Sequence, residues 1–124
     1  MTSTLNQNAI HDALPAEALQ LIAQRFRVLG DPTRLRILNV LMQGEHTVSE
    51  LVDETGFQQA NVSKHLSLLR SSGFVTRRKE GVRAHYGLAD DSVFTLCEIM
   101  CGRIEARADA HLSLLSDRSS SDAP

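Results

Sequence analysis

The sequence predicts a mainly helical protein that carries one small β-hairpin. Apolar residues recur at helical spacing in most of the 124-residue chain, which is the main sequence signal for amphipathic helices. One segment, residues 74–88, changes to strand-like residues on either side of a glycine turn. Glycines, prolines and capping residues separate the segments. We therefore expect four helices, then the hairpin, then a final helix.

The first two helices are predicted from their boundaries. Pro15 suits the first turn of a helix, and Gly30 ends it. Asp31 can cap the next helix with Pro32 in its first position, and Gly44 stops it. The apolar faces we expect are Leu19, Ile22, Ala23, Phe26 and Leu29 in the first helix, and Leu35, Leu38 and Leu41, with Ile37 beside them, in the second.

Residues 47–75 carry the most informative pattern of the chain. Thr47 can cap a third helix, and Glu50 three residues later completes a capping box. Gly56 lies at the following turn, where we expect a positive φ. The fourth helix runs from Gln58 to about Ser71. Two short amphipathic helices joined by such a turn are typical of a helix-turn-helix that enters a DNA groove.

The remaining segments complete a winged helix-turn-helix. The pair Glu80-Gly81 is a hairpin-turn signal, and a long final helix is expected from Asp90 or Asp91 to about Leu115. By composition, residues 1–14 form a flexible arm and residues 116–124 a disordered tail. Residues 15–115 then form one winged-helix DNA-binding domain.

The charge is unevenly distributed along the chain. The formal net charge is −2, but residues 58–88 hold six basic residues and one acidic residue, a local net charge of +5. The remaining residues carry seven basic and fourteen acidic side chains, a net charge of −7. Phosphate attraction acts within a screening length of ~8–10 Å, so the basic segment decides whether the protein can bind a nucleic acid.

The fourth helix has an apolar stripe and a polar outer face. Val62, Leu66 and Leu69 form the stripe. On or near the opposite face we predict base contacts by Gln59, Asn61 and Ser63, a phosphate or guanine contact by Lys64, and a phosphate contact by Ser67. His65 borders the apolar stripe, so a packing role is expected for it. Solvent exposure alone is the simpler interpretation of each polar residue, but the face contains no acid, which favours DNA.

The hairpin gathers basic side chains near its turn, Arg77, Arg78, Lys79 and Arg83. An arginine at such a tip can enter a narrow, electronegative minor groove. We favour Arg78 and Arg83 for this role, although alternation along the strands does not by itself settle which side chains face outward. His85 is a further candidate for a phosphate contact.

Several classes of protein are excluded or disfavoured by the sequence. No apolar run approaches the ~18–20 residues of a membrane span, and the first residues lack the features of a signal peptide, so we expect a cytoplasmic protein without membrane contact. We find no carboxylate pair, activated nucleophile or phosphate loop with motif spacing, so no enzymatic activity is expected. A winged-helix module that binds protein is the alternative, but its recognition helix would carry apolar residues outside.

The chain closely resembles the ArsR-type family of bacterial winged-helix transcriptional regulators. The resemblance covers roughly residues 15–115 and rests on FRVLGDPTRLRIL at 26–38, VSELVDETGFQQANVSKHLSLLRSSGFV at 48–75 and RRKEGVRAHYGL at 77–88. It implies a homodimer formed through the first and last helices. It also implies that each protomer reads half of an imperfect palindromic operator, and that an inducer releases the repressor from double-stranded DNA.

Two sensor sites known in this family do not match the sequence. A site with thiols in the helix equivalent to residues 47–55 is missing, because that helix has no cysteine. A zinc site on the last helix would begin Asp-x-His, but Asp90 is followed by Ser92 in the histidine position. Arg103 and Ala106 occupy the positions of the later ligands. Neither family site predicts the inducer.

The only two cysteines, Cys97 and Cys101, lie four residues apart on the predicted last helix, a spacing that stacks both thiols on one side. In a dimer with paired last helices, up to four thiols could bind a thiophilic metal or metalloid ion, or undergo oxidation or persulfidation. The alternative is that they pack as small apolar residues beside the helical stripe, in a regulator without a metal or thiol sensor. The sequence leaves these interpretations open.

Overall fold

The computed structural model describes the backbone of residues 13–122 and the side chains of residues 13–110. The predicted flexible arm, residues 1–14, lies almost wholly outside the described residues. The chain divides into two units, with the division between Ala89 and Asp90, and each unit is described by itself.

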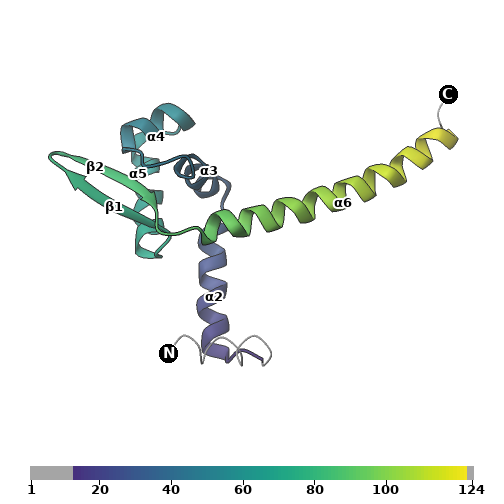
Figure 1. Ribbon diagram of the computed structural model, residues 1–124, viewed down its shortest axis with the longest axis horizontal. Coiled ribbons are helices and arrows are strands. Elements are labelled where there is room, and N and C mark those ends of the chain that lie inside the picture. The colour runs from purple at the N-terminus through teal and green to yellow at the C-terminus, as the bar shows by residue number, and fades with distance from the viewer. Residues whose placement is uncertain (1–12, 123–124) are drawn as a thin grey trace. The chain divides into compact units, whose positions relative to one another are not determined.

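The predicted fold class is confirmed: the chain is mainly helical and carries a two-stranded antiparallel hairpin (Figure 1). The first unit contains α2 (Ala16–Leu29), α3 (Pro32–Leu41), α4 (Val48–Thr55), α5 (Gln59–Ser71), β1 (Val75–Glu80) and β2 (Arg83–Leu88). The second unit contains α6 (Ser92–Asp122). Helices α3, α4 and α5 contact one another, α5 contacts β1, and both α3 and α4 contact β2.

The helix boundaries of the first unit follow the predicted capping residues. Asp31 accepts a hydrogen bond from the backbone N–H of Arg34 at 3.2 Å. Thr47 and Glu50 form the complete capping box: the Thr47 N–H donates to Glu50 Oε1 at 2.8 Å and the Glu50 N–H donates to Thr47 Oγ1 at 3.2 Å. The first of these bonds holds the pKa of the Glu50 carboxyl below its usual value. Capping by Asp31 and by Thr47 with Glu50 therefore starts α3 and α4 at the predicted residues.

The core of the first unit lies between α3, α4, α5 and the start of β1. Its largest fully buried side chains in these elements are Ile37, Leu38, Leu51, Val62, Leu66 and Leu69. The predicted apolar face of α3 was wrong in part, because Leu35 is 39% exposed and Ile37 is fully buried. Neighbours on several sides give α3 a wide buried face centred on its last turns, and at 100° per residue Leu35 falls outside that face.

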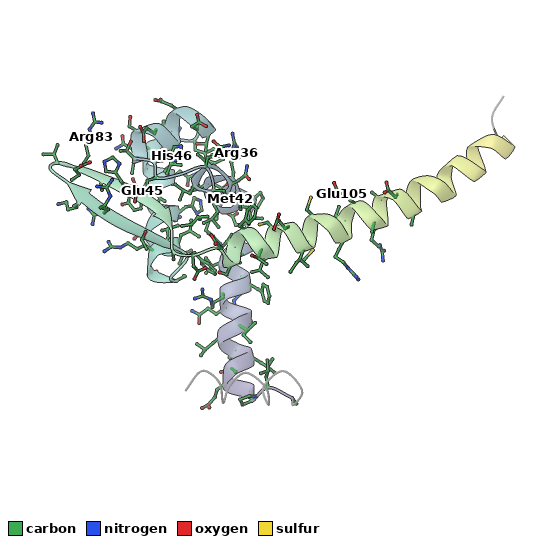
Figure 2. The ribbon with its side chains drawn as sticks, in the orientation of Figure 1. Arg36, Met42, Glu45, His46, Arg83 and Glu105 are labelled. Atoms are coloured by element: carbon green, nitrogen blue, oxygen red, sulfur yellow. The ribbon has the colours of Figure 1, made fainter. Side chains whose placement is uncertain are left out.

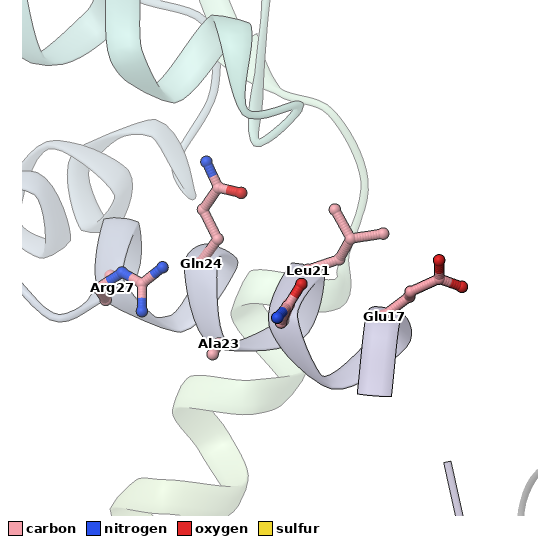
Figure 3. Close-up of a pocket in the computed structure, with 6 residues that line it drawn as sticks. Glu17, Leu21, Ala23, Gln24 and Arg27 are labelled. Carbon is pink, nitrogen blue, oxygen red and sulfur yellow. The ribbon is translucent and has the colours of Figure 1, made fainter. Parts of the chain in front are cut away.

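Helix α2 does not bury its predicted apolar stripe within the described chain. Of its residues only Val28 is buried, whereas Leu19, Ile22 and Phe26 are 51%, 38% and 58% exposed. Figure 3 shows the hollow along this helix, whose described lining comes from α2 alone: Glu17, Gln20, Leu21, Ala23, Gln24 and Arg27. The helix itself is as predicted, but the described residues of the first unit do not cover its apolar face.

The hairpin has a tight turn and a third backbone partner. Residue pairs run from Val75 with Leu88 to Glu80 with Arg83, so two residues, Gly81 and Val82, make the loop. Gly81 has φ 64°, and no described residue other than glycine has a positive φ, a combination that fits a type II′ turn. The chain before α4 also joins the sheet through an isolated bridge between His46 and Tyr86, which no strand pattern around His46 predicts.

The second unit is a single helix. Asp90 Oδ1 accepts hydrogen bonds from the backbone N–H of Ser92 at 2.9 Å and from its hydroxyl at 2.6 Å, which marks the start of α6. The helix continues to Asp122, beyond the end near Leu115 that the sequence predicted. No glycine or proline between Arg103 and Asp122 interrupts it. None of the helices in the described part of the chain is both long and apolar enough to span a membrane.

We expect Thr47→Ala to lower the free energy of unfolding by about 1 kcal/mol, because the Glu50 N–H loses its acceptor at the start of α4. Urea unfolding followed by circular dichroism measures this loss. Ser49→Ala, at an exposed position within the same helix, is the matched control and should leave stability within ~0.5 kcal/mol of the unsubstituted protein. Equal losses in both variants would contradict a capping role.

Candidate nucleic-acid interface

Helix α5 is held to the first unit by a narrow stripe and exposes the rest of its surface. Val62, Leu66 and Leu69 are each 0% exposed, and their spacing places them on one side of the helix. All five residues predicted to contact DNA from this helix lie at exposed positions: Gln59, Asn61, Ser63, Lys64 and Ser67. The helix therefore presents amides, hydroxyls and one ammonium group to solvent, without a carboxylate among them.

The turn before α5 fixes where this helix begins. Gly56 adopts φ 77°, as predicted, and its N–H donates to Val52 O at 2.8 Å. The Thr55 hydroxyl donates to Leu51 O at 2.6 Å and accepts from the Phe57 N–H at 3.2 Å. The N-cap of α5, Gln58, makes no side-chain capping bond. The Gln58 side chain thus does not occupy the positive end of α5, a helix end that favours an approaching anion.

The register of the hairpin sorts its basic residues onto two faces. Arg78 lies opposite His85, and Glu80 lies opposite Arg83, so these four side chains share one face of the two-stranded sheet. Arg77 and Lys79 lie on the other face, opposite Tyr86 and Ala84. Figure 2 shows Arg83 near the tip of the hairpin. The two arginines favoured for DNA contact, Arg78 and Arg83, therefore belong to the same face.

The surroundings of these two arginines differ. Arg78 Nη2 lies 2.8 Å from Glu45 Oε1, and Arg78 Nη1 lies 3.6 Å from Glu80 Oε1. The bond to Glu45 raises the pKa of Arg78 and lowers the pKa of the Glu45 carboxyl. Within the described chain, the Arg83 side chain has no hydrogen-bond or ion-pair partner, and the same holds for Lys64, Arg77 and Lys79. The Arg78 side chain is therefore paired with carboxylates, whereas the Arg83 side chain is available to bind a ligand such as a phosphate.

Comparison with known proteins identifies the family of this chain. Residues 31–77 match the family described as "Bacterial regulatory protein, arsR family". The chain is 40% identical over 88 residues to a "Probable mercury resistance operon repressor" of Streptomyces lividans, an alignment covering 71% of this chain and 69% of the relative. The chain belongs to the arsR family. It is thus a transcriptional regulator with a DNA-binding winged helix-turn-helix, and not an enzyme.

Solved structures support the same assignment. The homodimeric winged helix-turn-helix DNA-binding domain of "a possible ArsR-family transcriptional regulator" from Mycobacterium bovis is 34% identical, with a TM-score of 0.64 over 78% of this chain and 86% of that chain. The antimony-specific transcriptional repressor AntR is 25% identical, with a TM-score of 0.70 over 86% of this chain and 94% of that chain. Both resemblances extend across most of this ArsR-family chain.

The candidate sensor residues of this ArsR-family protein lie on α6. Cys97 is half-buried, Cys101 is exposed, and both are free thiols. In the part of the chain whose side chains are described, no group of three or more histidine, cysteine, aspartate or glutamate residues could hold a metal ion. One described chain therefore offers at most two thiols at this position, and any further ligand would come from elsewhere.

Arg34 ties α2 to α5, a connection that sequence reasoning missed. Its Nε donates to Val28 O at 2.6 Å, and its Nη2 donates to Arg27 O at 3.4 Å, both near the end of α2. Its Nη1 lies 3.3 Å from His65 Nδ1 on α5. Because a guanidinium only donates, His65 Nδ1 is the acceptor in this part-buried contact. No local spacing pattern signals the contact, because Arg34 and His65 are 31 positions apart.

We expect Arg34→Lys to lower the free energy of unfolding by about 1–3 kcal/mol, because an ammonium group cannot serve both carbonyl oxygens and His65 from one position. Chemical denaturation of the purified protein measures this change. Arg36→Lys is the matched control, since Arg36 donates one exposed hydrogen bond, to Glu54 O at 3.1 Å. A loss no larger than that of the control would show that Arg34 is not a structural link.

Proposed function

We propose that the protein is a homodimeric repressor that reads an imperfect palindromic operator with one α5 helix from each protomer, and that residues 15–115 form its DNA-binding and dimerisation domain. The observation that carries this proposal is the acid-free polar face of α5 above a fully buried stripe. A helix in the major groove needs short polar side chains toward the bases and firm support behind. Family membership supports the same function.

The exposed residues of α5 divide into base-reading and phosphate-binding roles. Gln59, Asn61 and Ser63 lie in its first half, where a recognition helix meets base edges. Side-chain amides pair with adenine, and hydroxyls serve as donors or acceptors. Lys64 contacts a phosphate or a guanine, and Ser67, further along, binds a phosphate. The positive N-terminus of α5 adds a favourable field for the DNA backbone.

The hairpin acts as the wing and places arginine in or near the minor groove. Arg83 borders the turn and has no acidic partner among the described residues. Arg78 shares its face one register pair closer to the body of the unit. A narrow minor groove attracts such side chains because its potential is strongly negative. We propose Arg83 as the principal wing contact and Arg78 as a second one.

The homodimer forms through α2 and α6, the first and last helices in the structure. Each carries apolar side chains that the described chain leaves open. In α2 these include Leu19, Leu21 and Phe26, and in α6 they include Ile99, Met100 and Ile104, all at least half exposed. Apolar area of this kind is stabilised by burial against a second chain. The homodimeric domain from Mycobacterium bovis supports the formation of a homodimer.

We expect Lys64→Ala or Arg83→Ala to weaken operator binding roughly 5- to 50-fold, because each dimer loses two cationic contacts to DNA. Fluorescence anisotropy with a promoter fragment over a salt series measures both the affinity and its salt dependence. If the lost contacts are to phosphates, the slope of log K against log salt falls by ~0.9 for each of them.

Arg36→Ala, which removes one exposed cation from α3, outside the proposed DNA and dimer contacts, is the control and should change affinity less than twofold. Binding of the unsubstituted protein that does not depend on salt would contradict the proposed function.

Cys97 and Cys101 form the proposed inducer site. They lie one helical turn apart on α6, and thiolates are the preferred ligands of thiophilic metals and metalloids. Two relatives are named for mercury resistance and for antimony specificity. A soft metal or metalloid ion, or an oxidant, would act at this pair. Two chains in a dimer would supply up to four thiols.

Cys97→Ser and Cys101→Ser should bind the operator as tightly as the unsubstituted protein, yet resist release by the inducer. Operator-bound protein is titrated with mercuric ion, trivalent antimony, peroxide and persulfide, and the released DNA is measured. If the inducers release DNA from both variants as efficiently as from the unsubstituted protein, the thiols have a packing role. The protein would then be a regulator without a thiol sensor.

A further inference from the structure

One arginine of the wing, Arg78, forms an ion pair with a glutamate that DNA would have to displace. Arg78 on β1 donates to Glu45 Oε1 through Nε at 3.2 Å and through Nη2 at 2.8 Å. Glu45 comes from the chain just before α4, 33 positions away in sequence. The Arg78 and Glu45 side chains are 52% and 44% exposed, so the contact lies open to solvent.

The backbone around Glu45 builds this contact into the fold. His46 exchanges two hydrogen bonds with Tyr86 of β2, at 2.9 and 2.8 Å, which places the preceding residue beside the hairpin. Gly87 completes the fit, because a Cβ at that position would lie only 3.2 Å from Glu45 Cγ. Figure 2 shows Glu45 and His46 close to the strands. The carboxylate therefore lies over β2, within reach of the Arg78 guanidinium.

Among the described lysines and arginines of α5 and the hairpin, Arg78 alone has carboxylates within salt-bridge distance. Glu80 also approaches Arg78, at 3.6 Å, and lies 3.2 Å from His85 Nε2. Lys64, Arg77, Lys79 and Arg83 have no carboxylate within salt-bridge distance in the described part of the chain. A phosphate and a carboxylate offer a guanidinium the same kind of acceptor, so they compete for Arg78.

We propose that Glu45 limits the affinity of the protein for its operator by competing with a DNA phosphate for Arg78. This inference rests on the proposed function, and it deepens that function by naming the residue that sets its strength. An exposed ion pair contributes little to stability, so DNA can displace Glu45 at a small cost. The Arg78–Glu45 ion pair must nevertheless break before Arg78 binds DNA, so its free energy is subtracted from the free energy of DNA binding. Glu45 is thus a positioning residue of the wing that weakens the complex.

The test is Glu45→Gln, measured by operator anisotropy over a salt series, in the unsubstituted protein and in an Arg78→Gln background. We expect Glu45→Gln to tighten binding about two- to fivefold for each protomer and to steepen the salt dependence. In the Arg78→Gln background the same change should have no more effect than the control. Asp53→Asn is that control, because it removes an exposed charge from nearby α4 without touching Arg78.

Each outcome decides the inference. Unchanged or weaker binding by Glu45→Gln, an equal gain in the Arg78→Gln background, or an equal gain from Asp53→Asn would each overturn it. Glu45→Ala repeats the test with a second side chain, and thermal unfolding confirms that every variant is folded. If the unsubstituted protein shows no salt-dependent operator binding, the proposed function itself fails. If it binds and Glu45→Gln brings no gain, only the role of Glu45 fails.

Discussion

The packing of α5 is the constraint on which the interface depends. Three buried side chains, Val62, Leu66 and Leu69, attach a helix of 13 residues. Because this stripe is narrow, most positions of α5 stay exposed and can carry polar groups. The wide buried face of α3 is one of the surfaces that α5 contacts. The buried stripe and the exposed polar face are therefore opposite sides of the same helix.

Charge is organised locally in the same way. The chain has a formal net charge of −2, yet residues 58–88, which include α5 and the hairpin, hold six basic residues and one acidic residue. Screening over ~8–10 Å prevents distant acids from cancelling this field. An acid in direct contact can neutralise a basic side chain, and within the described chain Glu45 makes the shortest such contact with Arg78, at 2.8 Å against 3.6 Å for Glu80. The strength of DNA binding is thus set by close contacts and not by the isoelectric point.

Features that depend on neighbours in sequence could be predicted, and features that depend on distant partners could not. Asp31, Thr47 with Glu50, and Gly56 act within a turn of their own helix, so the helix starts and the turn followed from spacing. The exposure of Leu35 depends on which elements surround α3. The Arg34–His65 and Glu45–Arg78 contacts join residues 31 and 33 positions apart. No periodicity records such pairs, and the base-reading roles on α5 await measurement.

The placement of the thiols constrains how an inducer could act. Cys97 and Cys101 lie on α6, whereas the candidate DNA contacts lie on α5 and the hairpin of the other unit. The proposed inducer site and the candidate DNA contacts thus belong to different units of the chain. In the proposed dimer, a palindromic operator fixes the spacing of the two recognition helices. A ligand on the thiols that rearranged the proposed α6 interface would change this spacing and so lower the affinity for the operator.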